Sequence, residues 1–396
     1  MNITGFALFG AKPAFEQPVP FGQLYFPTWD RYEAAMRGIF DRQYYNNNGP
    51  LHQQLDEKLR DFFVVNHVIC VHNATLGLMM LADAMGLSGK VIMPAFTFAA
   101  SAQSLTWAGL EPVFCDVDPI THHIDPDRVK ALIGNGVSAI MGVNLLGGAC
   151  DQGALAAVAE ANGIQVYFDS AHAFGCEAGG VKIGNFGRAE VFSFHSDNII
   201  NAAEGGCICT SDDELAARLR SIRPSYGPDI PVNILRVANA RMSEAQAAAA
   251  LMGLEDFQAN RANNEKLFHL YEKFLVEIPG LRLVRPGGVS LSNYQHLVCV
   301  VDEAEFGMGR DLLIKLLRAE NILAKRLFYP GLHRSIPYVN ALPQYGETLP
   351  NTDRLCARSV QFPIGALVSA PDVERICGIL LMAHQNAGEI LARHAK

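Results

Sequence analysis

Features typical of exported and membrane proteins are missing from this sequence. No apolar run reaches the roughly 20 residues that a membrane-spanning helix needs, and the first residues show no basic region followed by an apolar run. The nine cysteines form no CxxC pair, and Cys207 and Cys209 alternate as small buried residues of a strand do. These absences predict a cytoplasmic protein with reduced thiols and no metal site.

The sequence is also poor in positive charge. It carries 32 Lys and Arg against 40 Asp and Glu, which gives a net charge of −8. This balance argues against a nucleic acid or a membrane as the main partner, while a local basic pocket for a phosphorylated small molecule stays compatible with it. The chain has 396 residues, 49% of them hydrophobic, and is therefore long enough for two domains.

Short apolar strands alternate with helical segments through the first half of the chain. This pattern predicts a mostly parallel central sheet with helices on both faces. After about residue 210 the pattern changes to long helices, the last expected over 370–395, with short strands between them. We therefore predict an α/β fold with a large domain at 1–250, including an irregular arm at 1–30, and a smaller α+β domain at 251–396.

Ligands of an open parallel sheet bind at the carboxyl ends of its strands, so the loops at those ends are candidate sites. The first loop, Asn73-Ala74-Thr75, opens a helix. Its backbone amides suit an anion, although an ordinary helix cap explains the same residues. The second loop contains Phe96 and Phe98, which serve either as core residues or as a flat face for a ring.

The third loop places a carboxylate where it is costly to bury. Asp169 ends an apolar strand and needs a cationic or hydrogen-bonding partner, for which a protonated pyridine nitrogen qualifies. His172 follows three residues later and can cover such a ring. A helix-capping Asp beside a surface His is the plainer interpretation of the same residues.

Two further polar loops follow. Residues 193–198 form one between apolar segments, and Glu204-Gly205-Gly206 closes it, which suggests backbone that approaches a ligand. The other covers residues 239–244 and precedes a long helix that Ser243 can cap.

Taken in order, these loops resemble those of the DegT/StrS-type sugar aminotransferases, which have the fold of aspartate aminotransferase (fold type I) and use pyridoxal phosphate. The resemblance covers nearly the whole chain. It also includes Asn48-Gly49-Pro50, Ile124-Asp125-Pro126 and the segment Phe328-Tyr329-Pro330-Gly331-Leu332-His333.

The resemblance implies a cofactor, pyridoxal or pyridoxamine 5'-phosphate, and a role for several residues. It implies an aromatic on the ring at Phe98, a carboxylate on the ring nitrogen at Asp169 and a residue packed against the ring at His172. It also implies a homodimer with shared active sites, in which Asn239 reaches the phosphate of the neighbouring subunit. The phosphate ligands that it implies within the chain are Ala74, Thr75 and Ser193.

One position departs from the family pattern. The family reads roughly Ser-Phe-His-x-Thr-Lys before Glu-Gly-Gly, and here Asp197 and Asn198 replace the Thr and the Lys. No lysine lies between Lys182 and Lys266, so no shift of the alignment restores one. In the family that lysine holds the cofactor as a Schiff base and then carries a proton. An Asn amide does neither.

Three explanations for Asn198 stay open. The enzyme works without the usual internal aldimine, as a related lysine-less sugar dehydratase branch does, with Asp197, His195 or His172 near the reacting atoms. Alternatively, the lysine was exchanged in an engineered trap of an ordinary aminotransferase, or the chain is a catalytically silent ligand-binding or regulatory homologue. Lys325, next to the Phe328 segment, can supply an amine from another direction or simply face solvent or a substrate phosphate.

The resemblance implies a substrate class but no single substrate. It implies a keto- or amino-sugar, nucleotide-linked, in a biosynthetic route. Substrate contacts are expected from the arm before residue 46 and from the stretch 223–236.

Overall fold

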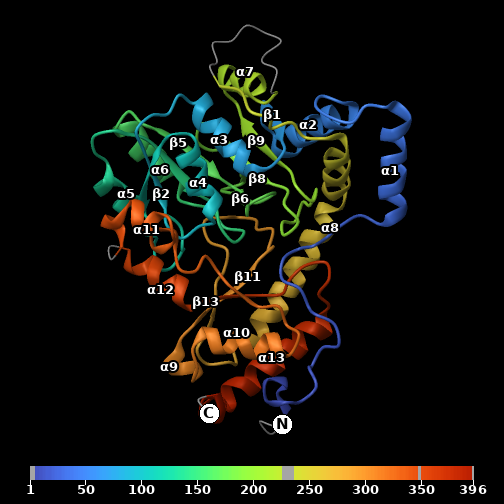
Figure 1. Ribbon diagram of the computed structural model, residues 1–396, viewed down its shortest axis with the longest axis vertical. Coiled ribbons are helices and arrows are strands. Elements are labelled where there is room, and N and C mark those ends of the chain that lie inside the picture. Colours follow the sequence, from blue (N-terminus) through green and yellow to red (C-terminus); the bar gives the residue numbers. More distant parts are fainter. Residues whose placement is uncertain (1–4, 225–235, 347–348, 395–396) are drawn as a thin grey trace.

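The computed structural model describes residues 5–224, 236–346 and 349–394. Figure 1 shows one end of the molecule built around a large sheet, a smaller unit at the other end, and a long helix, α8 (Glu244–Leu275), that runs from one to the other. Both ends of the described chain lie in the smaller unit.

The large sheet has seven strands, and most of their pairings are parallel. Its order is β1 (His67–Val71), β9 (Gly206–Thr210), β8 (Glu190–Ser193), β5 (Gln165–Asp169), β4 (Val137–Val143), β2 (Lys90–Pro94) and β3 (Glu111–Cys115). Only β9 runs antiparallel to its neighbours, β1 and β8. The strands are buried almost throughout, as expected for a sheet covered on both faces.

Helices cover both faces of this sheet. One face carries α3 (Ala74–Ala84), α4 (Ala99–Trp107) and α7 (Asp213–Ile222). The other carries α2 (Pro50–Phe63), α5 (Pro126–Leu132), α6 (Gln152–Ala161) and the first turns of α8. Outside these layers lie α1 (Trp29–Arg42), which contacts α8, and a small hairpin of β6 (Glu177–Ala178) and β7 (Val181–Lys182). The side chains of Cys207 and Cys209 are buried, as the sequence predicted.

The smaller unit is an antiparallel sheet with helices packed on it. The strand order is β10 (Leu281–Leu283), β11 (Leu297–Val301), β13 (Ser359–Phe362) and β12 (Lys325–Arg326). Its helices are α9 (Glu303–Phe306), α10 (Arg310–Ala319), α12 (Pro350–Arg358), α13 (Ala370–Gln385) and α14 (Ala387–His394). The short helix α11 (Tyr338–Ala341) packs on the large unit instead, where the Tyr338 ring contacts Phe114 of β3. The single helix expected over 370–395 is therefore two, because the backbone of Asn386 leaves the helical conformation and its side chain bonds the Met382 carbonyl.

The N-terminal arm packs on the smaller unit. Phe6, Phe15 and Val19 are buried in its core, and the Glu320 carboxylate accepts hydrogen bonds from the amides of Ala7 and Ala14. The predicted boundary at 250–251 falls inside α8, whose first half packs in the core of the large unit and whose second half packs in that of the smaller one. The division of the chain into 1–250 and 251–396 stays a prediction.

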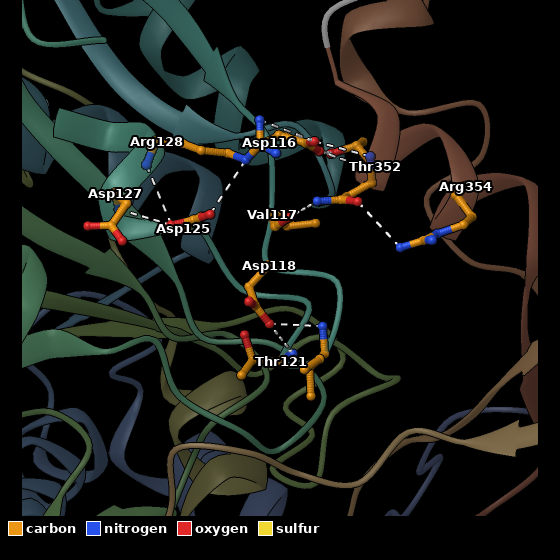
Figure 2. Close-up of polar contacts among 11 residues, drawn as sticks. Asp116, Val117, Asp118, Thr121, Asp125, Asp127, Arg128, Thr352 and Arg354 are labelled. Carbon is orange, nitrogen blue, oxygen red and sulfur yellow. Dashed lines mark hydrogen bonds and ion pairs between the residues drawn. The ribbon is translucent and has the colours of Figure 1, made fainter. Parts of the chain in front are cut away.

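The two units also meet beside β3. Figure 2 shows Asp116, which directly follows this strand, bonded to the start of α12. Its carboxylate accepts hydrogen bonds from the amides of Asn351 and Thr352 and from the Thr352 hydroxyl, at 3.1, 2.8 and 2.8 Å. Since α12 leads into β13, this contact fixes the smaller sheet against the edge of the large one.

No helix within the described ranges is both long and apolar enough to cross a membrane.

Candidate active site

The carboxyl end of β5 places a buried acid at the centre of the site. The Asp169 carboxylate accepts hydrogen bonds from the Ser101 hydroxyl at 2.7 Å and from the Ala171 amide at 3.2 Å. Burial raises the pKa of Asp169. Among the described residues, no Lys, Arg or His forms an ion pair with it. A buried carboxylate without a cation suits a ligand that brings a positive charge, and a protonated ring nitrogen is such a ligand.

His172 follows on the same loop and is held as a neutral imidazole. Burial, together with the charge of Lys325, lowers the pKa of His172 to about 4. Its ring centroid lies 4.2 Å from that of His296, and its buried Nδ1 has no hydrogen-bond partner within the described parts of the chain. An unpartnered buried nitrogen of this kind is ready to bond a ligand.

The start of α3 lies at one end of the candidate site. The Asn73 side chain caps the helix by accepting a hydrogen bond from the Leu76 amide at 2.9 Å. A Cβ on Gly206 would lie 2.9 Å from the Ala74 amide nitrogen, so glycine lets β9 approach the helix start closely. Because Gly206 pairs with Ser193 on β8, the start of α3 at Ala74 and the end of β8 at Ser193 lie on either side of the same glycine. The phosphate-binding role of Ala74, Thr75 and Ser193 stays a prediction. Helix N-terminal amides and a hydroxyl fit a phosphate group.

Phe98 lies at the start of α4 with 65% of its surface exposed, whereas Phe96 is fully buried. A large aromatic face left in solvent beside a buried acid is available for stacking. Ser101, one helical turn after Phe98, is the residue that bonds Asp169. The helix α4 therefore positions both the aromatic and the partner of the acid.

Asn198 lies in the loop after β8 and is only 6% exposed. Its side-chain nitrogen donates to the Ser193 carbonyl at 3.2 Å, and its side-chain oxygen accepts from Gln295 Nε2 at 3.3 Å. Both ends of the amide are therefore used within the chain. The neighbouring Asp197 turns toward Lys325, whose Nζ lies 3.7 Å from its Oδ2.

Two predicted site residues lie further out. His195 has a half-exposed side chain whose Nε2 is 4.0 Å from Glu204. Asn239 is exposed and accepts a hydrogen bond from the Arg241 side chain at 3.0 Å, so its role at a neighbouring subunit stays a prediction. Most of the stretch 223–236, expected to contact substrate, lies outside the described residues.

Sequence reasoning missed a buried polar row behind Asn198. Gln295 contacts Asn198 and His296, and His296 is in turn bonded to Gln361 on β13 at 3.1 Å. Gln23 of the arm bonds Asn264 at the same depth. These residues lie in segments without a motif. Gln295, His296 and Gln361 lie before or within short strands, whereas Gln23 lies in the arm and Asn264 in the middle of α8.

Comparison with known proteins agrees with this geometry. The model of the DegT/DnrJ/EryC1/StrS aminotransferase family matches residues 30–381. A dTDP-4-amino-4,6-dideoxy-D-glucose transaminase of Shigella dysenteriae is 32% identical over 364 residues, which cover 91% of this chain and 98% of that protein. GDP-perosamine synthase of Caulobacter vibrioides is 31% identical over 335 residues, 83% of this chain and 88% of that protein.

Solved structures extend the likeness to the fold. DesI, determined in the presence of its TDP-sugar product, has a TM-score of 0.92 and 36% identity, with full coverage of both chains. The predicted α/β fold, with a mostly parallel large sheet and a smaller second unit, is therefore confirmed.

Proposed function

The chain belongs to the DegT/DnrJ/EryC1/StrS aminotransferase family, and from this premise we propose an enzyme that works without the family's Schiff-base lysine. It binds pyridoxal or pyridoxamine phosphate non-covalently and acts on a nucleotide-linked keto- or amino-sugar. The observation that carries this proposal is the buried Asn198, whose side-chain nitrogen and oxygen are both hydrogen-bonded within the chain, at the position where the family has its lysine.

The residues present fit the cofactor. The amides of Ala74 and Thr75 and the Ser193 hydroxyl would hold its phosphate, and the exposed face of Phe98 would stack on its ring. Asp169 would hold the ring nitrogen protonated, which relieves the burial of its own unpaired charge. When bound, the cofactor supplies an electron sink for the carbon that gains or loses the amino group.

The substrate class is supported by the relatives. The two transaminase and synthase relatives given above are named after nucleotide-linked sugars, and DesI was determined with a TDP-sugar product. We extend this class to the present chain, without choosing the sugar, the base or the reacting carbon. The shared active sites of a homodimer belong to the same proposal, with Asn239 as the residue that crosses between subunits.

A second candidate function is a ligand-binding homologue without turnover. Asn198 favours it as well, because an amide has no basic nitrogen for either task of the missing lysine. Turnover separates the two candidates, since both bind the cofactor.

The test combines cofactor binding with reduction by borohydride. The native protein should bind both cofactor forms, but borohydride should attach no pyridoxal phosphate to any peptide. Asn198→Lys should restore attachment at residue 198, detected by peptide mass. Asp169→Asn should weaken binding by about tenfold or more, because hydrogen bonds between charged groups contribute about 1.5–3 kcal/mol.

Turnover is then measured with nucleotide-linked keto-sugars and pyridoxamine phosphate. Product formation by the native protein supports the enzyme, and its absence with every sugar tried favours the silent homologue. Borohydride attachment to a lysine of the native protein would contradict the non-covalent site. An Asp169→Asn variant that unfolds would be uninformative, but removal of an unpaired buried charge should leave stability equal or higher.

A further inference from the structure

An amine lies beside Asn198, although it comes from the other unit. Lys325 is the first residue of β12, and its Nζ lies 3.7 Å from Asp197 Oδ2 and 3.8 Å from the ring centroid of Phe21. Asp197 directly precedes Asn198. The amine is therefore held between the N-terminal arm and the loop that would carry the missing lysine.

The strand pairing directs Lys325 toward the site. Lys325 pairs with Gln361 on β13, and directly paired residues have their side chains on the same face of a sheet. Gln361 is hydrogen-bonded to His296, and Gln295, which precedes His296 in the chain, is hydrogen-bonded to Asn198. The charge of Lys325 also acts on His172 and His296. The amine thus shares one polar cluster with two residues of the candidate site.

The arm closes over this cluster. The backbone amide of Gln23 donates a hydrogen bond to the Asp197 carbonyl at 3.1 Å, and a Cβ on Gly22 would lie 3.2 Å from the Asp197 carboxylate. Gly22 has φ +80°, a conformation that favours glycine. The backbone at 21–23 is thereby fitted to Asp197, with the Phe21 ring against the amine.

We propose that Lys325 is the proton-transferring amine of this site and that Asp197 positions it. The inference rests on the function proposed above. The two departures from the family pattern then belong together: Asn198 removes one amine, and Asp197 holds another in reach of the same loop. As a neutral amine Lys325 takes a proton from the reacting carbon of the sugar, whose electron pair would pass to the bound cofactor. As an ammonium Lys325 then delivers the same proton to the atom that receives this electron pair, so the transfer balances without an oxidant or a second reactant.

The charges around Lys325 agree with such a role. Burial lowers the pKa of Lys325, whereas Asp197 raises it, and burial prevails. Burial also lowers the pKa of His172 and of His296, so both face the amine as neutral rings. Arg326, the next residue of β12, turns instead to Asp311 at 2.9 Å and to the Tyr329 ring. Among the described residues, Asp197 is the carboxylate that lies against Lys325.

The first test needs no cofactor. Acetic anhydride labels neutral amines, so the labelling of Lys325 against pH, followed by peptide mass, gives the pKa of its amine. Asp197→Thr restores the family residue and removes the group that raises this pKa, so labelling at neutral pH should increase severalfold. Lys182 is the internal control, because its Nζ also lies over a phenylalanine ring, that of Phe62 at 4.1 Å, in another part of the chain.

The second test uses the enzyme with cofactor and sugar. Lys325→Ala should slow turnover by about 10²–10⁴ and leave cofactor affinity within a few-fold. Added ethylamine should restore part of the rate. Lys325→Arg keeps the charge but cannot release a proton at ordinary pH, so it should be as slow as Lys325→Ala. Lys182→Ala should behave like the native protein.

Several outcomes would overturn the proposal. If Lys325→Arg stayed active and Lys325→Ala bound the sugar more weakly, Lys325 would be a contact of the substrate phosphate instead. Unchanged turnover in Lys325→Ala would show that Lys325 does not transfer the proton. A labelling profile of Lys325 that is the same in Asp197→Thr would show that Asp197 does not act on this amine. Absence of turnover in the native protein would overturn the proposed function and this inference together, whereas native turnover that survives Lys325→Ala would overturn the inference alone.

Discussion

Two buried carboxylates lie at the ends of neighbouring strands, and their surroundings give them different tasks. Asp169 has no cationic partner among the described residues and therefore suits a ligand that brings a positive charge. Glu190, on the adjacent β8, is surrounded by donors of the chain itself: the amides of Gly184 and Phe186 at 2.6 and 2.9 Å, and the Ser170 hydroxyl. Ser170 follows Asp169 directly, so Glu190 fixes the strand end that presents the acid of the site.

Glu190 leads to a prediction about pH. Burial raises its pKa from 4.5 to about 7. Between those values the unfolded chain releases a proton that the folded chain keeps, so this group's stabilising contribution is complete below pH 4.5 and is lost as pH rises toward 7. The loss amounts to about 1.4 kcal/mol of unfolding free energy per pH unit. Glu190→Gln should remove this pH dependence of the unfolding free energy.

The measurement is urea unfolding at several pH values, with the slopes of native and variant protein compared. Glu214→Gln on the exposed side of α7 is the matched control and should keep the native slope. Equal slopes for the native protein and Glu190→Gln would contradict a raised pKa in the folded state.

At the residue scale, the sequence predicted those site residues that belong to a loop in register with the family pattern, such as Phe98, Asp169 and Asn198. It could not predict what holds them. Gln295 meets Asn198 across about a hundred positions of the chain, and Phe21 reaches Lys325 across about three hundred. Local residue patterns carry no signal for such contacts, because they depend on how the two units pack.

At the scale of elements, apolar runs predicted the strands well because those strands are buried on both faces, as β2 and β5 are. Helix ends were less predictable. The apolar spacing continues from α13 into α14, but the backbone of Asn386 leaves the helical conformation and α13 ends there. The Asn386 side chain joins its own backbone amide in donating a hydrogen bond to the Met382 carbonyl. Such an end depends on a single residue, so the apolar spacing does not reveal it.

The cap of α3 provides a prediction at this scale. Asn73→Ala removes the side chain that accepts from the Leu76 amide, which should lower the unfolding free energy by about 1 kcal/mol. Because the same helix start would hold the phosphate, affinity for pyridoxal phosphate should fall as well. Thermal unfolding and a binding titration measure the two effects.

The control is Asp151→Ala, which removes the cap of α6. The Asp151 side chain accepts from the Ala154 amide at 2.9 Å, in the same geometry but away from the candidate site. It should show a similar loss of stability and unchanged affinity. If both variants lost affinity equally, general destabilisation rather than the anion site would explain the effect of Asn73→Ala.

At the scale of the whole molecule, the site needs both units in a fixed relation, because Asp169 and Asn198 come from one and Lys325 from the other. Two links supply this relation. Helix α8 contributes to both cores, and an apolar cluster that includes Phe96 and Val117 of the large unit packs on Leu327 and Leu355 of the smaller one. Asp116, bonded to the start of α12, lies directly beside this cluster (Figure 2).

Asp116→Asn should loosen that link. The side chain keeps its shape, but its new amide group cannot accept the hydrogen bond from the Asn351 or the Thr352 amide that the lost oxygen accepted. A buried donor left without an acceptor costs about 1–3 kcal/mol, and the helix start also loses a favourable negative charge. We expect an unfolding free energy lower by that amount, together with faster proteolysis around α12 under native conditions.

Asp127→Asn is the matched control, since this residue of α5 is exposed and its carboxylate pairs with Lys130 at the surface. Such a solvent-exposed pair contributes little to stability. If Asp116 joins the two units, its variant should also weaken binding at the site between them, with lower affinity for the cofactor and slower turnover, while Asp127→Asn changes neither. An Asp116→Asn variant that loses stability but keeps native proteolysis around α12 and native affinity would show instead that Asp116 stabilises the edge of the large sheet alone.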